Sequence, residues 1–276
     1  MPIRNKSFLC LIRNDKMEFN LTENEILARS KVCLALDVPS TEEASRYVSE
    51  LHEVVGLYKV GKELFTSEGP DVVKVIQKEG GDVFLDLKYH DIPNTVRAAS
   101  KAATKLGVSM FNVHASGGNE MMQYALKGVE EGVKEYGVER PKVIGVTILT
   151  SIDDRIMNEE LGISGKVEDQ VLKLAKLAEN SGLDGIVCSA ADLHAVKDHL
   201  RKGLIYVTPG VKGPRTKAGT DQKRVFTPGN AMQDGSSILV IGRAITDPFR
   251  RGKGKTSFEE MRTSGYDILQ DMAPYV

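Results

Sequence analysis

The chain of 276 residues has only three cysteines, Cys10, Cys33 and Cys188. They lie far apart and form no CxxC pair, which argues against a disulfide framework or a cysteine-based zinc site and favours a reducing cytosol. The five histidines include no HExxH motif. We therefore expect no transition-metal site built by the protein.

The sequence also lacks an excess of either charge, since 37 Lys and Arg residues stand against 38 Asp and Glu residues, for a net charge of -1. A chain without a global basic field is not expected to bind nucleic acid or an anionic membrane, so any anion recognition must be local. No apolar run approaches the ~18 residues of a membrane span. The run from Phe8 to Ile12 is too short for a secretory signal. These absences predict a soluble, cytoplasmic protein with no membrane partner.

From residue 31 onward, short aliphatic or β-branched runs alternate with segments of helical apolar spacing, such as Val96, Ala99 and Ala103. Continuous apolar strands separated by helices indicate parallel strands that are covered on their outer face. The expected strands are 31–37, 57–60, 82–88, 110–114, 142–149, 185–188, 204–208 and 238–241.

Eight such units in about 250 residues suit a closed barrel. An open doubly wound sheet would leave two edges to protect. We therefore predict an α/β protein, with one (β/α)8 TIM-barrel catalytic domain over residues 31–276. Residues 1–30 have no place in the repeat and are expected to form an N-terminal extension, with partial disorder as one expectation and Met17 as an alternative start.

Charged residues interrupt the predicted strands near their ends. Asp86 and Lys88 are two positions apart and should point to the same face of the third strand, and Lys59 lies near the end of the second. Because the ends of parallel barrel strands meet at one mouth, Lys59, Asp86, Lys88 and Asp91 could neutralise one another in a partly desolvated site. Flanking carboxylates would favour a protonated lysine, which is a ready proton donor. A structural ion pair and, for Asp91, a cap of the following helix are the alternatives.

A second group of candidates follows the seventh and eighth strands. The glycine-rich segment 208–222 carries Lys212 and Arg215, and Gly242 and Arg243 follow the last strand. The loops after strands 7 and 8 of a barrel frequently bind phosphate through backbone N–H groups and an arginine. The alternative is a mobile, solvated loop with incidental charge. Together with the lysine-carboxylate group, this pattern predicts a phosphorylated substrate that is held at one end and transformed at the other.

Seven motifs stand in order between about Lys31 and Pro248: "LALDV", "YKVGKELF", "FLDLKYHDIPNTV", "VTILTS", "VTPGV", "DQKRVFTP" and "VIGRAI". They resemble the successive motifs of the orotidine 5'-phosphate decarboxylase family, bacterial type. The resemblance implies a (β/α)8 barrel that forms a homodimer with shared active sites. It also implies conversion of orotidine 5'-phosphate to UMP and CO2 in de novo pyrimidine biosynthesis, with no metal and no cofactor.

The resemblance further implies a role for each matching residue. Lys59, Asp86, Lys88 and Asp91 would form the catalytic network, with Lys88 protonating the C6 carbanion. Asp91 and Thr95 would reach into the partner's site. The implied substrate-binding residues are Asp37 and Lys59 at the ribose, Thr150 at the pyrimidine, Gln222, Gly242 and Arg243 at the phosphate, and in addition Thr95, Pro209 and Lys212.

One departure concerns position 212, where relatives often carry arginine and this chain has Lys212. A lysine keeps the charge but loses the bidentate geometry of arginine. Whether Lys212 or Arg215 closes on the phosphate therefore stays open.

Two other functions also stay open. A Mg²⁺-dependent 3-keto-gulonate 6-phosphate decarboxylase or hexulose phosphate synthase would carry a similar Asp-x-Lys-x-x-Asp segment, but with an acidic residue on the second strand, where this chain has Lys59. The third reading is a non-catalytic nucleotide-binding barrel. The intact set of charges argues against it, because buried charges are costly to keep.

Overall fold

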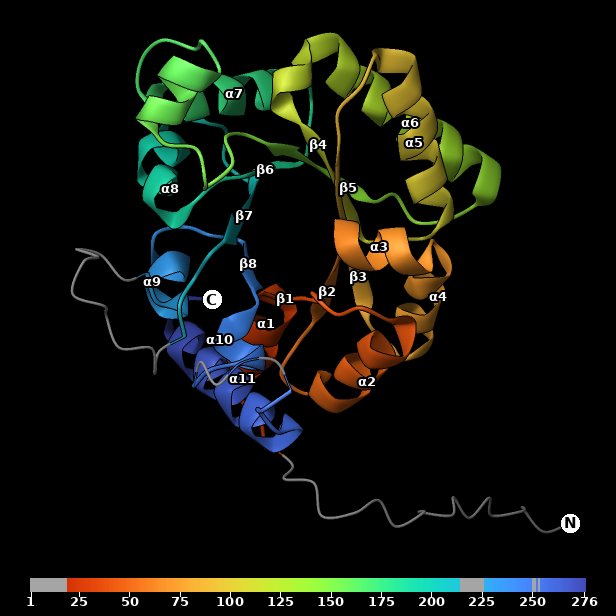
Figure 1. Ribbon diagram of the computed structural model, residues 1–276, viewed down its shortest axis with the longest axis vertical. Coiled ribbons are helices and arrows are strands. Elements are labelled where there is room, and N and C mark those ends of the chain that lie inside the picture. Colours follow the sequence, from red (N-terminus) through yellow and green to blue (C-terminus); the bar gives the residue numbers. More distant parts are fainter. Residues whose placement is uncertain (1–18, 214–225, 250–251, 253) are drawn as a thin grey trace, which may run out of the picture.

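The computed structural model describes residues 19–213, 226–249, 252 and 254–276. Within these residues, parallel strands follow one another around a closed barrel in chain order, and the last pairs with the first (Figure 1). The strands are β1 (Val32–Ala35), β2 (Leu57–Gly61), β3 (Asp82–Tyr89), β4 (Met110–His114), β5 (Lys142–Val146), β6 (Gly185–Val187), β7 (Ile205–Pro209) and β8 (Ile238–Ile241). The predicted (β/α)8 barrel is confirmed.

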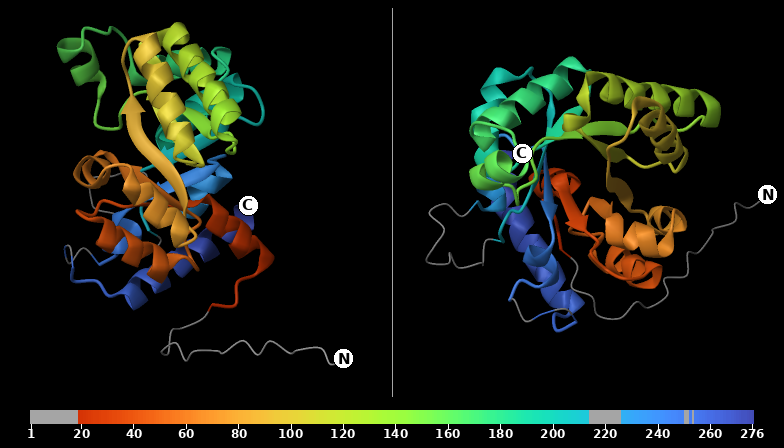
Figure 2. Two further views of the ribbon diagram at one scale, coloured as in Figure 1. Left: turned by 90° about the vertical axis from the view of Figure 1, so that its right-hand side faces the viewer. Right: turned by 45° about the horizontal axis from the view of Figure 1, so that its top comes forward.

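Helices surround the barrel (Figures 1 and 2). None of those in the described part of the chain is both long and apolar enough to cross a membrane. The α-helices are α1 (Glu23–Lys31), α2 (Thr41–Leu51), α3 (Lys62–Glu68), α4 (Asp71–Lys78), α5 (Pro93–Lys105), α6 (Gly118–Tyr136), α7 (Val167–Asn180), α8 (Ala190–Val196), α9 (Pro228–Gln233), α10 (Arg243–Thr246) and α11 (Phe258–Met272). Shorter turns are the 3-10 helices η1 (Ala115–Gly117), η3 (Lys197–His199) and η4 (Ala273–Tyr275) and the π-helix η2 (Ile156–Glu160).

Local signals account for several element boundaries. Helix α2 begins after Ser40, whose side chain accepts a hydrogen bond from the Glu43 N–H, a common form of helix cap. The strand expected over 142–149 ends earlier, at Val146. Just beyond it, the Thr147 hydroxyl donates to the carbonyl of Val187, so a side chain continues the contact with β6 where the strand stops.

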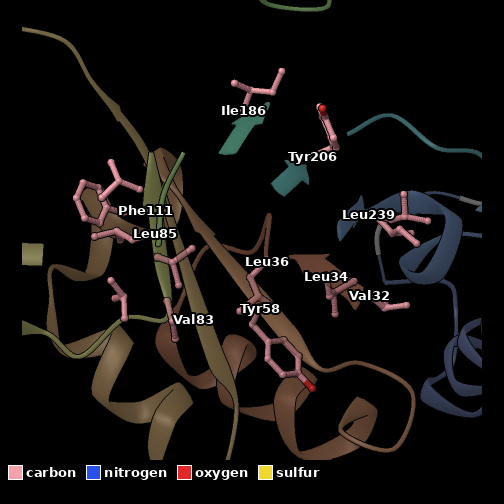
Figure 3. Packing of buried hydrophobic residues seen from close by; sticks show 14 of the residues in the cluster. Val32, Leu34, Leu36, Tyr58, Val83, Leu85, Phe111, Ile186, Tyr206 and Leu239 are labelled. Atoms are coloured by element: carbon pink, nitrogen blue, oxygen red, sulfur yellow. The ribbon is translucent and has the colours of Figure 1, made fainter. Parts of the chain in front are cut away.

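Successive residues of each strand face alternately the helices and the barrel interior. Val32 and Leu34 pack in the outer layer, between strands and helices, whereas Cys33 lies in the inner cluster. Figure 3 shows this outer layer continuing around the barrel through Leu85 and Phe111. The inner cluster consists of Cys33, Leu57, Phe84, Met110, Ile144 and Val207.

This inner cluster forms an apolar floor beneath the mouth of the barrel. Two residues further along β2, β3 and β4, on the same inward face, the chain places Lys59, Asp86 and Asn112. On these three adjacent strands, the inward-facing side chains therefore change from hydrophobic to polar within two residues.

Part of the predicted N-terminal extension is folded. Residues 1–18, which include the alternative start Met17, lie outside the described residues. Helix α1 begins with a capping box and leads directly into β1. The ring of Phe19 stacks on that of Tyr266 in α11, with the centroids 4.4 Å apart. The start of the described chain is therefore joined to its last long helix.

Helices α5 and α6 approach each other closely because α6 has glycines at the contact. A Cβ atom added at Gly128 would lie 2.1 Å from the carbonyl oxygen of Arg97. One added at Gly132 would lie 2.8 Å from the Cβ of Thr104. The ion pair between Arg97 and Glu131, at 2.9 Å, flanks this contact. A side chain therefore has no room at Gly128, where it would meet the backbone of α5, or at Gly132, where it would meet the side chain of Thr104.

We expect Gly128→Ala to lower the free energy of unfolding by about 1–3 kcal/mol, because the added methyl group forces the two helices apart. The exposed Glu130 on the same helix provides the matched control, since Glu130→Ala should change stability by no more than about 0.5 kcal/mol. Urea unfolding followed by circular dichroism measures both. Equal stability of the two variants would contradict the close helix contact.

Candidate active site

Four charged side chains of alternating sign lie in a row at the mouth of the barrel. The Nζ of Lys59 lies 3.6 Å from Oδ1 of Asp37 and 3.4 Å from Oδ2 of Asp86. The other oxygen of Asp86, Oδ1, accepts a hydrogen bond from Nζ of Lys88 at 2.5 Å. Asp86 is thus shared by two lysines. The side chains of Lys59 and Asp86 are only 12% and 11% exposed, so water compensates little of their charge.

The row is built from residues on, or just after, three neighbouring strands. Lys59 is the middle residue of β2, Asp86 and Lys88 belong to β3, and Asp37 follows β1. Parallel pairing of β1 with β2 and of β2 with β3 brings these ends together. The predicted combination of Lys59, Asp86 and Lys88 is therefore present in the structure.

Strand β3 departs from regular pairing where it carries the charges. Leu85 pairs with Phe111 and Tyr89 with Val113, so four steps along β3 correspond to two along β4. Within this bulge Lys88 has a φ of 54°, in the left-handed region that residues with a side chain rarely adopt.

Asn112 of β4 bridges this irregular segment and was not predicted from the sequence. Its Oδ1 accepts a hydrogen bond from the backbone N–H of Lys88 at 2.8 Å, and its Nδ2 donates to Oδ1 of Asp86 at 2.7 Å. Asn112 is 1% exposed. The available signal was a single amide within the otherwise apolar run "MFNV", because buried polar groups require partners.

A cavity of about 290 Å³ opens above the charged row. Lys59, Asp86, Lys88 and Asn112 lie on its polar side. Its other walls are largely apolar and come from β5, β6 and the segments that follow them, with Val146, Ile148, Leu149 and Val187 among the lining residues. Thr150, predicted to contact the substrate, also lines this cavity. A flat ring with polar edges would fit between the charges and the apolar walls.

A second cavity, of about 360 Å³, lies beside the first and shares Pro209 and Val240 with it. The predicted residues Asp37, Lys212, Gly242 and Arg243 line this cavity together with Gly210 and Asp247. Its glycine-rich backbone and two cations suit an anion. The remaining candidates for this anion, Gln222 and Arg215, lie outside the described residues.

Asp91 and Thr95 do not join either cavity within one chain. Both are exposed, and neither lines the two cavities. Asp91 Oδ1 accepts a hydrogen bond from the N–H of the next residue, Ile92, at 2.7 Å. The first helical residue of α5 is Pro93, and its N-cap is Ile92 without a side-chain cap, so the interpretation of Asp91 as the helix cap is wrong. Within one chain, the fourth charged side chain of the row is that of Asp37.

His114 ends β4 next to the charged row. Its ring lies 5.3 Å from that of His90, measured between centroids. Burial, together with the neighbouring His90, Lys88 and Lys62, lowers the pKa of His114 to about 4. This imidazole is therefore neutral near pH 7, and it does not add a positive charge to those of Lys59 and Lys88 at the mouth of the barrel.

The two carboxylates of the row, Asp37 and Asp86, both face the ammonium group of Lys59. Across the described residues, no group of three or more His, Cys, Asp or Glu side chains could hold a metal ion. A divalent cation between these two carboxylates would have to displace Lys59, whose positive charge repels it.

Comparisons with known proteins agree with this geometry. A family model described as "Orotidine 5'-phosphate decarboxylase / HUMPS family" matches residues 30–248. The chain is similar to the orotidine 5'-phosphate decarboxylase of Moorella thermoacetica, with 44% identity over 79% of this chain and 86% of that protein. It is 48% identical to the Vibrio cholerae protein of the same name, over 78% of this chain and 91% of the relative.

Solved structures give the same relationship. The crystal structure of orotidine 5'-phosphate decarboxylase from Lactobacillus acidophilus superposes with a TM-score of 0.74 at 36% identity, covering 87% of this chain and 98% of that one. The protein of that name from Pyrococcus horikoshii OT3, at 20% identity and a TM-score of 0.64, supports the fold alone.

We expect the His114 ring to titrate near pH 4 in the folded protein, below its usual value of about 6.5. Between these pH values the unfolded chain binds the proton and the folded chain does not, so His114 makes the protein less stable as pH falls from about 6.5 to 4. Titration of the histidine ring resonances by NMR measures the pKa, and His114→Gln identifies the signal and should weaken the loss of stability. A His114 resonance that titrates at or above pH 6.5 would contradict the burial.

Proposed function

The chain belongs to the orotidine 5'-phosphate decarboxylase / HUMPS family, and we infer that it converts orotidine 5'-phosphate to UMP and CO2, a step of de novo pyrimidine biosynthesis. One observation carries this inference most directly. Asp86 is shared by two lysines at the polar side of a cavity large enough for a pyrimidine, next to a second cavity that contains Arg243. The distribution of charge matches a substrate with a carboxylate on its ring and a phosphate at its far end.

The two cavities suggest how the substrate lies. Arg243, Gly242 and Lys212 would hold the phosphate in the second cavity. The ribose hydroxyls would meet Asp37 and Lys59, which lie between the cavities. The pyrimidine would then occupy the first cavity, with its edge near Thr150 and C6 towards Lys88.

The chemistry requires stabilisation of negative charge on carbon. When the bond between C6 and the carboxylate breaks, CO2 leaves and the electron pair stays on C6, where the ring offers no electron sink. The ammonium group of Lys88 would stabilise this developing charge and then donate its proton to C6, which gives UMP and a neutral amine that water reprotonates. Asp86 would orient Lys88 and lie near the departing carboxylate.

Asp91 and Thr95 are proposed to act in the neighbouring subunit of a homodimer. Both are exposed near the start of α5, beside Ile92, a hydrophobic side chain that is 68% exposed. A second subunit placed over this surface would cover Ile92, and Asp91 would then complete the partner's charged row. The partner of the protein is therefore a second copy of the chain.

A magnesium-dependent reaction on the same scaffold is less well supported. It would need an acidic ligand on the second strand, where Lys59 instead lies 3.4 Å from Asp86. The proposed reaction needs no cofactor. A cytoplasmic location stays a prediction, in keeping with the described cysteines Cys33 and Cys188, which are free and buried.

The assay of first choice follows the loss of the orotate absorbance when the purified protein is mixed with orotidine 5'-phosphate, with and without EDTA. We expect turnover that EDTA does not change, whereas a magnesium-dependent enzyme would lose activity.

In the same assay Lys88→Ala should lower kcat by about 10⁴-fold or more, because both the adjacent positive charge and the proton donor are lost. UMP should still bind this variant, as isothermal titration calorimetry can measure. Near-normal turnover by Lys88→Ala would remove the proposed role.

The shared site can be tested by mixing two inactive variants, Lys88→Ala and Asp91→Ala. Each mixed dimer would contain one site with both native residues, so refolding an equimolar mixture should restore about a quarter of the wild-type activity. Either variant refolded alone is the control. A mixture that stays inactive, although mixed dimers form, would place Asp91 outside the partner's site.

A further inference from the structure

We propose that Asn112 is a positioning residue, which holds Lys88 and Asp86 in their reactive arrangement before substrate binds. The proposal rests on the decarboxylase function inferred above and adds a residue on the neighbouring strand to its machinery. Asn112 would act through Lys88 and Asp86 and need not touch the substrate's reacting atoms.

The bulge in β3 creates the need for such a residue. Regular pairing between β3 and β4 is interrupted between Leu85 and Tyr89, so Lys88 lies where the strand ladder is broken. The side-chain oxygen of Asn112 accepts the Lys88 N–H at 2.8 Å in place of a backbone carbonyl. A side chain thus satisfies a partly buried backbone group that the bulge would otherwise leave without a partner.

The same contact fixes the direction in which Lys88 leaves the strand. Lys88 has a φ of 54°, which an L-residue adopts only when its surroundings impose it. The hydrogen bond from its N–H to Asn112 is such a constraint, because it ties the peptide on the amino side of Lys88 to the adjacent strand. The backbone conformation in turn determines where the ammonium group lies in the cavity.

The nitrogen end of the Asn112 amide binds the carboxylate of Asp86. Its Nδ2 donates to Oδ1 of Asp86 at 2.7 Å, the same oxygen that accepts from Lys88 Nζ at 2.5 Å. Two donors on Oδ1 leave Oδ2 facing Lys59 at 3.4 Å, so the carboxylate plane is fixed between the two lysines. One planar amide therefore aligns both the proton donor and the group that orients it.

The burial of Asn112 indicates that this alignment exists in the free protein. The residue is 1% exposed, and both polar ends of its side chain are engaged. Rotation of the amide would break both bonds inside the barrel, where water offers no replacement. The charged row is thus preorganised, which is the condition for electrostatic stabilisation of a developing carbanion.

The test compares wild type with Asn112→Ala, which removes both hydrogen bonds, and Asn112→Asp, which keeps an acceptor for the Lys88 N–H but loses the donor to Asp86. The matched control is Thr104→Val, since Thr104 is a buried polar residue of α5 whose hydroxyl donates to the carbonyl of Ser100, and neither residue lines either cavity. For each protein, kcat for orotidine 5'-phosphate, Kd for UMP and Tm are measured.

We expect Asn112→Ala to lower kcat by about 10²-fold, the scale of loss when a reacting group is displaced by about 1 Å. The Kd for UMP should stay within about threefold of wild type, because UMP lacks the carboxylate and Asn112 does not line the second cavity, where the phosphate is proposed to bind. Thr104→Val should lose some thermal stability and keep kcat. If Asn112→Ala does not fold, Asn112→Asp decides, and it too should lose kcat with UMP binding retained.

Two results would overturn the proposal. One is a kcat within threefold of wild type for the folded Asn112 variant. The other is an equal loss of kcat and UMP affinity that follows Tm, as expected of a residue that only supports the barrel. Because wild-type turnover is measured first, absence of any decarboxylation would instead count against the proposed function.

Discussion

Two lysines can lie side by side at the end of a barrel only when a carboxylate stands between them. Asp86 meets this condition, with one oxygen towards Lys59 and the other towards Lys88. Without this carboxylate, each ammonium group would lose its hydration with no compensating interaction, and this desolvation would strongly destabilise the folded state. The position of Asp86 therefore sets the requirements for its neighbours. Lys88 must leave the strand in an unusual conformation to reach it, and Asn112 must hold both groups in that geometry.

The barrel meets these requirements through the simple alternation of its strands. The floor residues Leu57, Phe84 and Met110 exclude water from below, and the next inward positions on the same strands carry the polar groups. A hydrophobic layer directly beneath the charges lowers the local dielectric and strengthens each interaction above it. The outer faces of these strands remain apolar and pack on the helices, so the polar layer does not interrupt the main core (Figure 3).

The sequence predicted the barrel, and the placement of Lys59, Asp86 and Lys88 at its mouth, because both follow from periodicity. Lys59, Asp86 and Lys88 were predicted from their place at the ends of apolar runs, and Arg243 from its place after the last strand. Asn112 could not be predicted in this way, since its role depends on a bulge in β3 that shifts the pairing register between β3 and β4. The alternation of polar and apolar residues within one strand does not determine how that strand pairs with its neighbour. The role of Asp91 could not be placed in this way either, since within one chain its side chain is exposed and lines neither cavity. The folded helix α1 was missed because its apolar pattern is weak and its contact with α11 joins segments far apart in the sequence.

The wall that the two cavities share has a consequence for inhibitor design. Pro209 and Val240 line both spaces, so a fragment bound over the charged row and an anionic fragment bound near Arg243 would lie on either side of the same two side chains. A short rigid linker across this wall would turn the second binding event into an intramolecular one, and the gain would come from effective concentration without any new contact. Selectivity could then be adjusted at one end of the ligand while the other end is left unchanged.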